Sequence, residues 1–325
     1  MILLQDKYDY ITKLTTQLTA RANVGKRKAS STIKIVRNQN RKGQNRFVSL
    51  DDSFRAIKEL NEQQEKLEKK DYQIDYYPEI SAQETFRIIK NYEGLITNSK
   101  LKVDKTFLDQ AQQLKIAIRA GSGMDIFDLE SAKEKGIICL NTPEGNKDAV
   151  AEHALGMLLS LTNNFTRADR QIRNDIWKRE ENRGEELSEM TIGIIGYGNN
   201  GSAFAERLSC LGVKVLAYDK YKKGFSKDNI EESTLEEIYE YADALSLHIP
   251  LTEETFYWIN LNFWEQFSRD IYFINCSRGK IVDLESLLKA LQTGKIKGAG
   301  LDVFENEPLY QMLKKQNKLF KYLQI

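Results

Sequence analysis

The sequence predicts an α/β protein with a doubly wound parallel sheet and a second, smaller α/β domain. Apolar runs alternate with helical patterns from Tyr72 to Val303, which is typical of parallel strands joined by crossover helices. The chain has 325 residues, more than one ordinary hydrophobic core, so we expect two domains. Glycine-rich and polar clusters follow several strands, at the edge where such sheets bind ligands.

Residues 1–50 are interpreted as a basic, disordered N-terminal extension. Its stretch 21–46 holds many lysines and arginines and no acid. Contact with RNA or another polyanion is one interpretation, but a solvated, mobile tail is the more ordinary one, and we assign the segment no function. The first strand of the small domain is hard to locate, and 33–36 and 47–50 are the two candidates.

Residues 51–145 are predicted to form the smaller domain. Its strand candidates are 94–97, 114–120 and 137–141, with helical segments around Phe107 and Asp128 between them. A long apolar helix over 146–161 then crosses to the second domain, which places the boundary near Gly145. Residues 146–325 form the larger domain.

The most informative stretch is the run from Thr191 to Gly201, which reads as strand, glycine turn and helix start. Gly196 permits a tight turn, and Gly198 lets the backbone approach a diphosphate. Gly201 lets the helix pack close to the strand and aim its free amides at the phosphates. A glycine-rich turn within a core is the alternative, but the order of elements favours a dinucleotide site.

Asp219 ends the next apolar strand and completes this site. A carboxylate there accepts hydrogen bonds from both hydroxyls of the adenosine ribose and repels a 2′-phosphate, so NAD is favoured over NADP. Nearby Lys220, Lys222 and Lys223 soften that preference.

Composition excludes several other classes of function. Lysine plus arginine (48) nearly balances aspartate plus glutamate (47), so no global charge attracts nucleic acid or anionic membranes. No apolar run approaches membrane-spanning length and the N-terminus lacks the pattern of a secretion signal, so we expect a cytoplasmic protein. Cys139, Cys210 and Cys276 lack metal-ligand or redox spacing and are interpreted as structural, so no metal site is expected.

Further strands are expected at 242–248, 271–277 and 298–303, and each ends in a chemically informative cluster. The clusters are His248-Ile-Pro-Leu-Thr252, Asn275-Cys-Ser-Arg278-Gly-Lys-Ile-Val-Asp283 and Asp302-Val-Phe-Glu-Asn-Glu307-Pro308. Ligands bind off the carboxyl ends of strands in doubly wound sheets, so these clusters are expected to be functional.

With these clusters, the chain resembles the D-isomer-specific 2-hydroxyacid dehydrogenase family, in particular its D-3-phosphoglycerate dehydrogenase-like branch. The resemblance runs from about Tyr72 to Pro308 and includes Arg119-Ala-Gly-Ser-Gly-Met-Asp125, Asn141-Thr-Pro-Glu-Gly-Asn146 and the Ala151-Glu152-His153 helix. It implies a Rossmann-type NAD domain, a flavodoxin-like substrate domain and a homodimer whose contacts involve the cofactor domain.

The family reaction moves a hydride between the nicotinamide and C2 of a 2-hydroxy or 2-oxo acid. By resemblance, Arg278 grips the substrate carboxylate and polarises the carbonyl, a role suited to a bidentate, permanently charged donor. Glu307 matches the glutamate that pairs with a catalytic histidine. Arg278 in a surface salt bridge and Glu307 as a solvated loop acid are the alternatives.

The remaining site residues also come from the resemblance. For substrate binding, the backbone amides of a loop form an anion-binding nest, and two side chains before it line the same pocket: Gly121, Ser122 and Gly123, with Asn98 and Ser99. For cofactor binding they are Gly196, Tyr197, Gly198, Asn199, Asn200, Gly201, Asp219, His248, Pro250, Thr252, Cys276, Ser277 and Asp302.

Two features depart from the family pattern. The family's acid/base histidine lies beyond the Glu-Pro pair, whereas this chain continues from Leu309 to Ile325 without one, so a truncated, impaired form is expected. His153 is interpreted as a packing or interface residue, and His248 is placed near the nucleotide. Members that bind a phosphorylated acid often have arginine where Asn98 stands, which leaves a phosphoglycerate substrate undecided.

We therefore expect an NAD-dependent D-2-hydroxyacid dehydrogenase that acts on a small-molecule 2-hydroxy or 2-oxo acid. A catalytically silent NAD(H)-sensing regulatory dimer is the alternative, which the missing histidine favours, and a damaged gene product is a third interpretation. The sequence does not identify the substrate.

Overall fold

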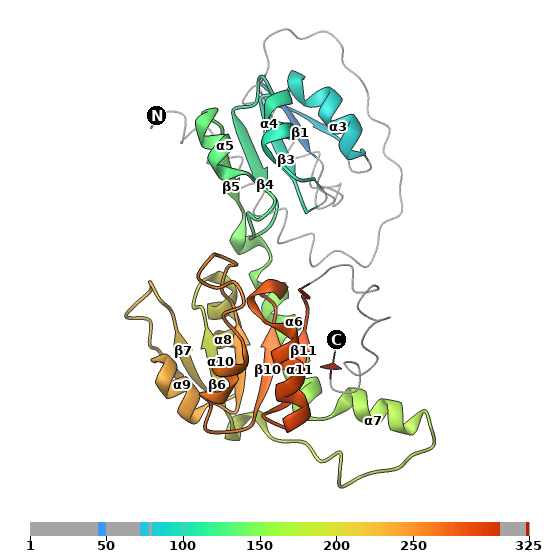
Figure 1. Ribbon diagram of the computed structural model, residues 1–325, viewed down its shortest axis with the longest axis vertical. Coiled ribbons are helices and arrows are strands. Elements are labelled where there is room, and N and C mark those ends of the chain that lie inside the picture. The colour runs from blue at the N-terminus through green and yellow to red at the C-terminus, as the bar shows by residue number, and fades with distance from the viewer. Residues whose placement is uncertain (1–44, 50–71, 78–79, 100, 306–322, 325) are drawn as a thin grey trace. The chain divides into compact units, whose positions relative to one another are not determined.

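The computed structural model describes residues 45–49, 72–77, 80–99, 101–305 and 323–324. The chain forms two compact units, Met1–Asn146 and Lys147–Ile325. The strand candidate 33–36, most of the basic segment and Glu307 lie outside the described residues. Each unit contains one parallel sheet (Figure 1), which confirms the predicted α/β class.

The described residues of the first unit form a five-stranded sheet in the order β2-β1-β3-β4-β5, which is the flavodoxin-like order. The strands are β1 (Asn45–Ser49), β2 (Tyr72–Tyr76), β3 (Gly94–Thr97), β4 (Ile116–Arg119) and β5 (Ile138–Asn141). The helices are α3 (Ala82–Ile88), η2 (Ile89–Asn91), α4 (Lys105–Gln110), α5 (Leu129–Glu134) and η3 (Pro143–Gly145).

The position of β1 corrects the expected start of the small domain. We expected residues 1–50 to be a disordered extension, but β1 pairs with β2 on one side and β3 on the other. The sheet therefore begins at Asn45, close to the second of the two candidates. An asparagine and an arginine precede the apolar pair Phe47–Val48, and the strand begins with them, two residues before the candidate 47–50.

In the second unit, the part of the chain that the structure describes forms a seven-stranded sheet in the order β12-β11-β10-β9-β6-β7-β8, a Rossmann-type arrangement extended by one strand. The strands are β6 (Thr191–Ile195), β7 (Lys214–Tyr218), β8 (Ile230–Glu232), β9 (Ala244–Leu247), β10 (Ile271–Asn275), β11 (Ile296–Leu301) and β12 (Leu323–Gln324). The helices are α6 (Lys147–Thr162), α7 (Phe165–Ile172), η4 (Leu187–Glu189), α8 (Asn199–Cys210), α9 (Leu235–Tyr241), α10 (Leu261–Glu265), η5 (Gly279–Ile281) and α11 (Leu284–Thr293).

Both faces of this larger sheet are covered. Alternate strand residues point to opposite faces: Ile192 and Ile194 of β6 pack in the core beneath α6 and α8, whereas Ile195 packs in the core beneath α9, α10 and α11. The strands read as continuous apolar runs because neither face meets water. The strand predicted at 298–303 lies two residues earlier, as β11, so Asp302 follows it directly.

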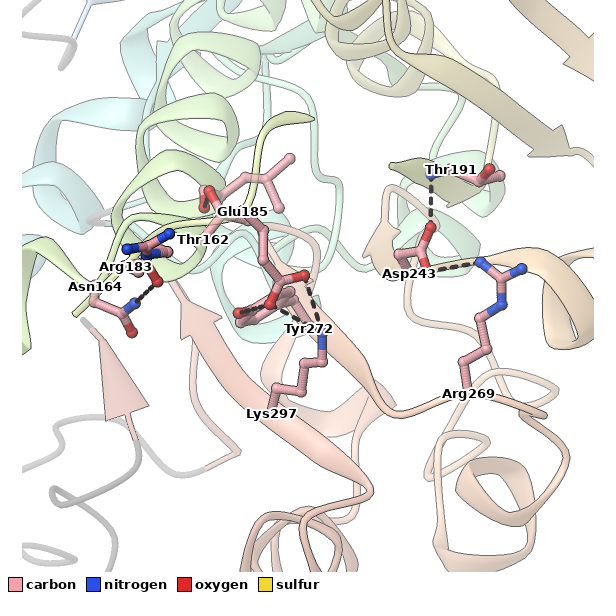
Figure 2. Close-up of polar contacts among 10 residues, drawn as sticks. Thr162, Asn164, Arg183, Glu185, Thr191, Asp243, Arg269, Tyr272 and Lys297 are labelled. Atoms are coloured by element: carbon pink, nitrogen blue, oxygen red, sulfur yellow. Dashed lines mark hydrogen bonds and ion pairs between the residues drawn. The ribbon is translucent and has the colours of Figure 1, made fainter. Parts of the chain in front are cut away.

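Ion pairs and hydrogen bonds connect the amino ends of strands in the second unit (Figure 2). Asp243, just before β9, accepts the backbone N–H of Thr191 at 2.9 Å and the guanidinium of Arg269 at 2.8 Å. Glu185 accepts the hydroxyl of Tyr272 at 2.9 Å and pairs with Lys297 at 3.0 Å. These contacts fix β6, β10 and β11 at the edge opposite to the glycine turn.

We predict that Asp243→Ala lowers the free energy of unfolding of the second unit by about 1–3 kcal/mol, because the N–H of Thr191 loses its acceptor. Arg269→Gln is the matched control and should cost less than about 1 kcal/mol, since it removes only a half-exposed ion pair. Urea unfolding followed by tryptophan fluorescence reports on this unit, which holds all three tryptophans. Equal losses in the two variants would contradict the assignment.

Candidate functional site

The glycine turn between β6 and α8 is shaped by close contacts between backbone segments. Gly196 has φ of 98°, and a Cβ there would lie 2.5 Å from the carbonyl oxygen of His248. A Cβ on Gly201 would lie 1.9 Å from the carbonyl oxygen of Gly196. Neither position can hold a side chain, so the sequence requirement inferred at both glycines has a direct steric cause.

Gly198 differs from the other two glycines because no atom lies within 4 Å of its Cβ position. It is exposed and is the N-cap residue of α8, and no side chain caps the helix. Within the described chain, the backbone N–H groups of Asn199 and Asn200 have no hydrogen-bond partner. A helix N-terminus of this kind binds anions through its free N–H groups and its dipole.

Asp219 stabilises this turn through hydrogen bonds with backbone N–H groups. Its carboxylate accepts the backbone N–H of Tyr197 at 2.8 Å and those of Tyr221 and Lys222 at 2.9 Å. Partial burial acts to raise the pKa of Asp219, but these three hydrogen bonds, with the charge of Lys222, hold it below its usual value. A carboxylate accepts about four hydrogen bonds. One acceptor position of Asp219 therefore remains free in this conformation, whereas hydrogen bonds from both ribose hydroxyls, as expected, need two.

His248 lies beneath the glycine turn. Its Nε2 is 2.9 Å from the hydroxyl of Ser246, its ring centroid is 5.5 Å from that of Phe204 in α8, and its buried Nδ1 has no partner. Burial lowers the pKa of the imidazole to about 4, so it is neutral near pH 7. These contacts show a packing role that the sequence did not predict, and the expected place of His248 near the nucleotide stays a prediction.

Ser277 connects the ends of β9 and β10, a structural role that the sequence did not predict. Its hydroxyl donates to the carbonyl oxygen of Leu247 at 2.6 Å and accepts the N–H of Ile249 at 3.1 Å. Because the side chain is buried and both of these contacts are within the protein, it stabilises the strand ends, and its expected contact with the cofactor stays a prediction.

Arg278 follows directly and is partly buried. Its guanidinium donates to the carbonyl oxygen of Ser277 at 2.7 Å, and its own carbonyl oxygen accepts from the side chain of Asn275 at 3.1 Å. Cys276 is half-buried, and burial, together with the nearby Asp302, raises the pKa of its thiol to about 12. The thiol is therefore protonated near neutral pH, in keeping with a structural cysteine.

Other expected cofactor residues lie at neighbouring strand ends. Exposed Pro250 and Thr252 belong to the loop after β9, where Thr252 and Thr255 cap one another and Thr255 also binds the carbonyl oxygen of Pro250 at 2.8 Å. Asp302 is exposed after β11, and its carboxylate is 3.4 Å from Nε2 of His153 on α6. His153 therefore has a carboxylate neighbour that sequence reasoning did not predict.

In the first unit, the predicted substrate residues follow the carboxyl ends of two paired strands, β3 and β4. Asn98 and Ser99 follow β3, and the loop 121–123 follows β4, which pairs with β3. The N–H of Ala120, just before this loop, donates to the carbonyl oxygen of Thr97 at 2.8 Å, which joins the two strand ends.

The anion nest is smaller than expected. Gly121 has φ of 152°, and its N–H donates to the buried hydroxyl of Thr142 at 2.9 Å, so this amide is occupied. The N–H groups of Ser122 and Gly123 have no partner among the described residues. Asn141 holds the carbonyl oxygen of Ser122 at 2.6 Å. Two amides remain for an anion, and Thr142 and Asn141 were not predicted as their supports.

The described residues lack both a membrane-spanning helix and a cluster of metal ligands. In the part of the chain that the structure describes, no helix has the length and apolar character needed to span a membrane. Among those same residues, no group of three or more metal-ligating side chains is close enough to hold an ion.

The fold and the glycine turn define a dinucleotide-binding α/β protein, and comparison with known proteins defines its family. Residues 155–322 match the model of the D-isomer specific 2-hydroxyacid dehydrogenase, NAD binding domain. A hydroxypyruvate reductase of Thermotoga maritima is 36% identical over 229 residues, which cover 70% of this chain and 74% of that protein. The chain therefore belongs to the D-isomer-specific 2-hydroxyacid dehydrogenase family, and NAD is confirmed as the cofactor of its larger domain.

Two further relatives show the range of the family. A D-3-phosphoglycerate dehydrogenase of Synechocystis is 37% identical over 239 residues, which cover 73% of this chain but 43% of that protein, so the match spans less than half of its length. The structure of a D-lactate dehydrogenase of Aquifex aeolicus, complexed with NAD and lactic acid, is similar with a TM-score of 0.67 and 30% identity, covering 84% of this chain and 81% of that one. These relatives do not support the alternative of a silent regulatory protein.

We predict that Gly198→Ala weakens NADH binding at least about tenfold without lowering the melting temperature, because its methyl group meets no protein atom but occupies the path of the diphosphate. Gly156→Ala, also in open space but within α6, is the matched control and should bind NADH normally. Calorimetric titration and thermal unfolding give the two readouts. An affinity for NADH that is unchanged in Gly198→Ala would contradict the diphosphate-binding role of this turn.

Proposed function

We propose that this protein is an NAD-dependent oxidoreductase that transfers a hydride between the nicotinamide and C2 of a small D-2-hydroxy or 2-oxo acid. The observation that carries the proposal is the joint presence, in one unit, of the open glycine turn at Gly198 and the anchored Arg278. Family membership and the relatives' printed activities support it.

The chain's residues fit an NAD cofactor. The uncapped amides of Asn199 and Asn200 would hold the diphosphate, and Asp219, which keeps one free acceptor position, would bind the adenosine ribose and repel a 2′-phosphate. When bound, the nicotinamide supplies or accepts the hydride. We propose that Pro250, Thr252, Cys276 and Asp302, all at neighbouring strand ends, line the cofactor.

We propose that Arg278 binds the carboxylate of the acid and polarises its C2 carbonyl. The guanidinium is permanently charged and planar, which suits it to a charge-assisted, bidentate contact with a carboxylate, and its Nη1 donates to the carbonyl oxygen of Ser277. The amides of Ser122 and Gly123, with Asn98 and Ser99, supply carboxylate-binding groups in the first unit. Glu307 keeps its proposed role as partner of an acid/base group.

Purified protein should oxidise NADH in the presence of glyoxylate, pyruvate, hydroxypyruvate or phosphohydroxypyruvate. Arg278→Gln should lower kcat/KM for the oxo acid by about 100-fold through loss of a charge-assisted contact, with NADH affinity unchanged. Exposed Arg179 gives the control variant Arg179→Gln, which should keep its activity. NADH binding without turnover of any acid in this panel would contradict the proposed reaction.

We also propose that the protein is a cytoplasmic homodimer whose contacts involve the segment from α7 to Trp177. This segment exposes four large apolar side chains: Phe165, Ile172, Ile176 and Trp177 are 58%, 52%, 43% and 78% exposed. Clusters of exposed apolar residues mark association surfaces. The NAD domain that carries the segment is the one that the family resemblance assigns to the dimer contact.

Light scattering after size exclusion should give twice the chain mass of 37.5 kDa for the wild type. The double variant Ile172→Ser/Trp177→Ser should shift the mass towards a monomer, because it removes two of the four apolar side chains. Tyr221→Ser, which changes an 83% exposed tyrosine elsewhere in the unit, serves as control. A monomeric wild type at micromolar concentration would refute the dimer.

A further inference from the structure

Tyr257 has an unusual backbone conformation. It lies after β9 with φ of 47°, in the left-handed region that favours glycine and disfavours bulky side chains. Its backbone N–H donates to the carbonyl oxygen of Lys280 at 3.0 Å, and two residues later Ile259 forms a β-bridge with Val282. The strained residue is therefore attached to the turn that follows Arg278. Such strain persists where surrounding contacts enforce it, and it is often functional.

The side chain of Tyr257 makes a second attachment. Its hydroxyl donates a hydrogen bond to Oε1 of Glu305, which lies in the segment after β11. This hydrogen bond, with a smaller effect of burial, raises the pKa of Tyr257 to about 12, so the phenol remains a donor across the physiological pH range. Tyr257 thus joins two segments that are distant in sequence.

Gly279 completes the arrangement. A Cβ on Gly279 would lie 1.9 Å from the carbonyl group of Phe304 and 2.4 Å from the backbone nitrogen of Glu305. The backbone at residues 304–305 therefore packs directly on the residue next to Arg278. Tyr257 is hydrogen-bonded to both segments of this contact, to Lys280 through its backbone N–H and to Glu305 through its hydroxyl.

We propose that Tyr257 is a positioning residue that fixes the turn carrying Arg278, through its combined hold on Lys280 and Glu305. This inference rests on the proposed function, in which Arg278 binds the carboxylate of the acid. Tyr257 touches neither substrate nor cofactor in this account. Its effect on the reaction comes from the placement of the guanidinium, because catalysis is sensitive to small displacements of the binding groups.

The first test is kinetic. Tyr257→Phe keeps the ring and removes the hydroxyl, and it should lower kcat/KM for the oxo acid about tenfold while the Kd for NADH stays within about twofold. Glu305→Ala should have a similar effect, whereas Glu305→Gln, which keeps an oxygen acceptor, should retain activity. Tyr241→Phe changes an exposed tyrosine of α9 and is the control.

A second variant separates positioning from stability. Tyr257→Gly relieves the left-handed strain and should leave the melting temperature close to that of the wild type, yet it should lower kcat/KM at least as much as Tyr257→Phe. Wild-type kinetics in Tyr257→Phe would overturn the inference.

Hydrogen exchange tests the same contact without turnover. The amides of residues 278–283 should exchange faster in Tyr257→Phe than in the wild type, and those of α8 should not change. Unchanged exchange at 278–283 would overturn the inference. A wild type that binds NADH but reduces no acid would contradict the proposed function alone, because the exchange experiment still reports on the positioning contact.

Discussion

The structure of the larger unit depends on the close approach of backbone segments at the carboxyl ends of its parallel strands. The carbonyl oxygen of Gly196 occupies the space of a side chain at Gly201, and the carbonyl oxygen of His248 occupies the space of a side chain at Gly196. Gly279 meets the backbone at residue 304 in the same way. Parallel pairing brings these turns to one edge, and only glycine allows them to pack there.

This packing leaves one place open. Gly198 lies in the same turn and has no neighbour at its Cβ position, so backbone amides at the start of α8 face solvent. The residues around the turn form hydrogen bonds within the protein, since Asp219 accepts three backbone N–H groups and Ser277 both donates and accepts. Backbone N–H groups that have no partner, in a turn whose neighbours are hydrogen-bonded within the protein, are suited to binding a diphosphate with little reorganisation.

Sequence patterns predicted the fold well because they report on burial. The strand at 94–97 matches β3, the helix at 146–161 lies within one residue of α6 at each end, and Asp219 directly follows β7. The glycine turn was predictable from its three glycines because their spacing has a steric cause. The candidate 47–50 overlaps β1, but the polar Asn45 and Arg46 gave no signal for the first two residues of that strand.

Contacts between distant segments could not be predicted from one sequence. The hydrogen bonds of Gly121 with Thr142 and of Tyr257 with Glu305 depend on which loops meet at the sheet edge, and no local pattern reports this. The backbone angle of Tyr257 is equally hidden, because tyrosine gives no signal for a left-handed conformation. The hydrogen bonds that the amide of Gly121 and the hydroxyl of Ser277 form within the protein were not predictable for the same reason.

Nuclear magnetic resonance of the backbone amides during titration with ADP-ribose tests the central claim most directly, since this ligand carries the diphosphate and both riboses without the nicotinamide. The amide resonances of Asn199 and Asn200 should show large, saturable shifts, and the amide resonance of Gly156 in α6 should not change. Saturating ADP-ribose that leaves the amides of Asn199 and Asn200 unshifted would contradict that claim.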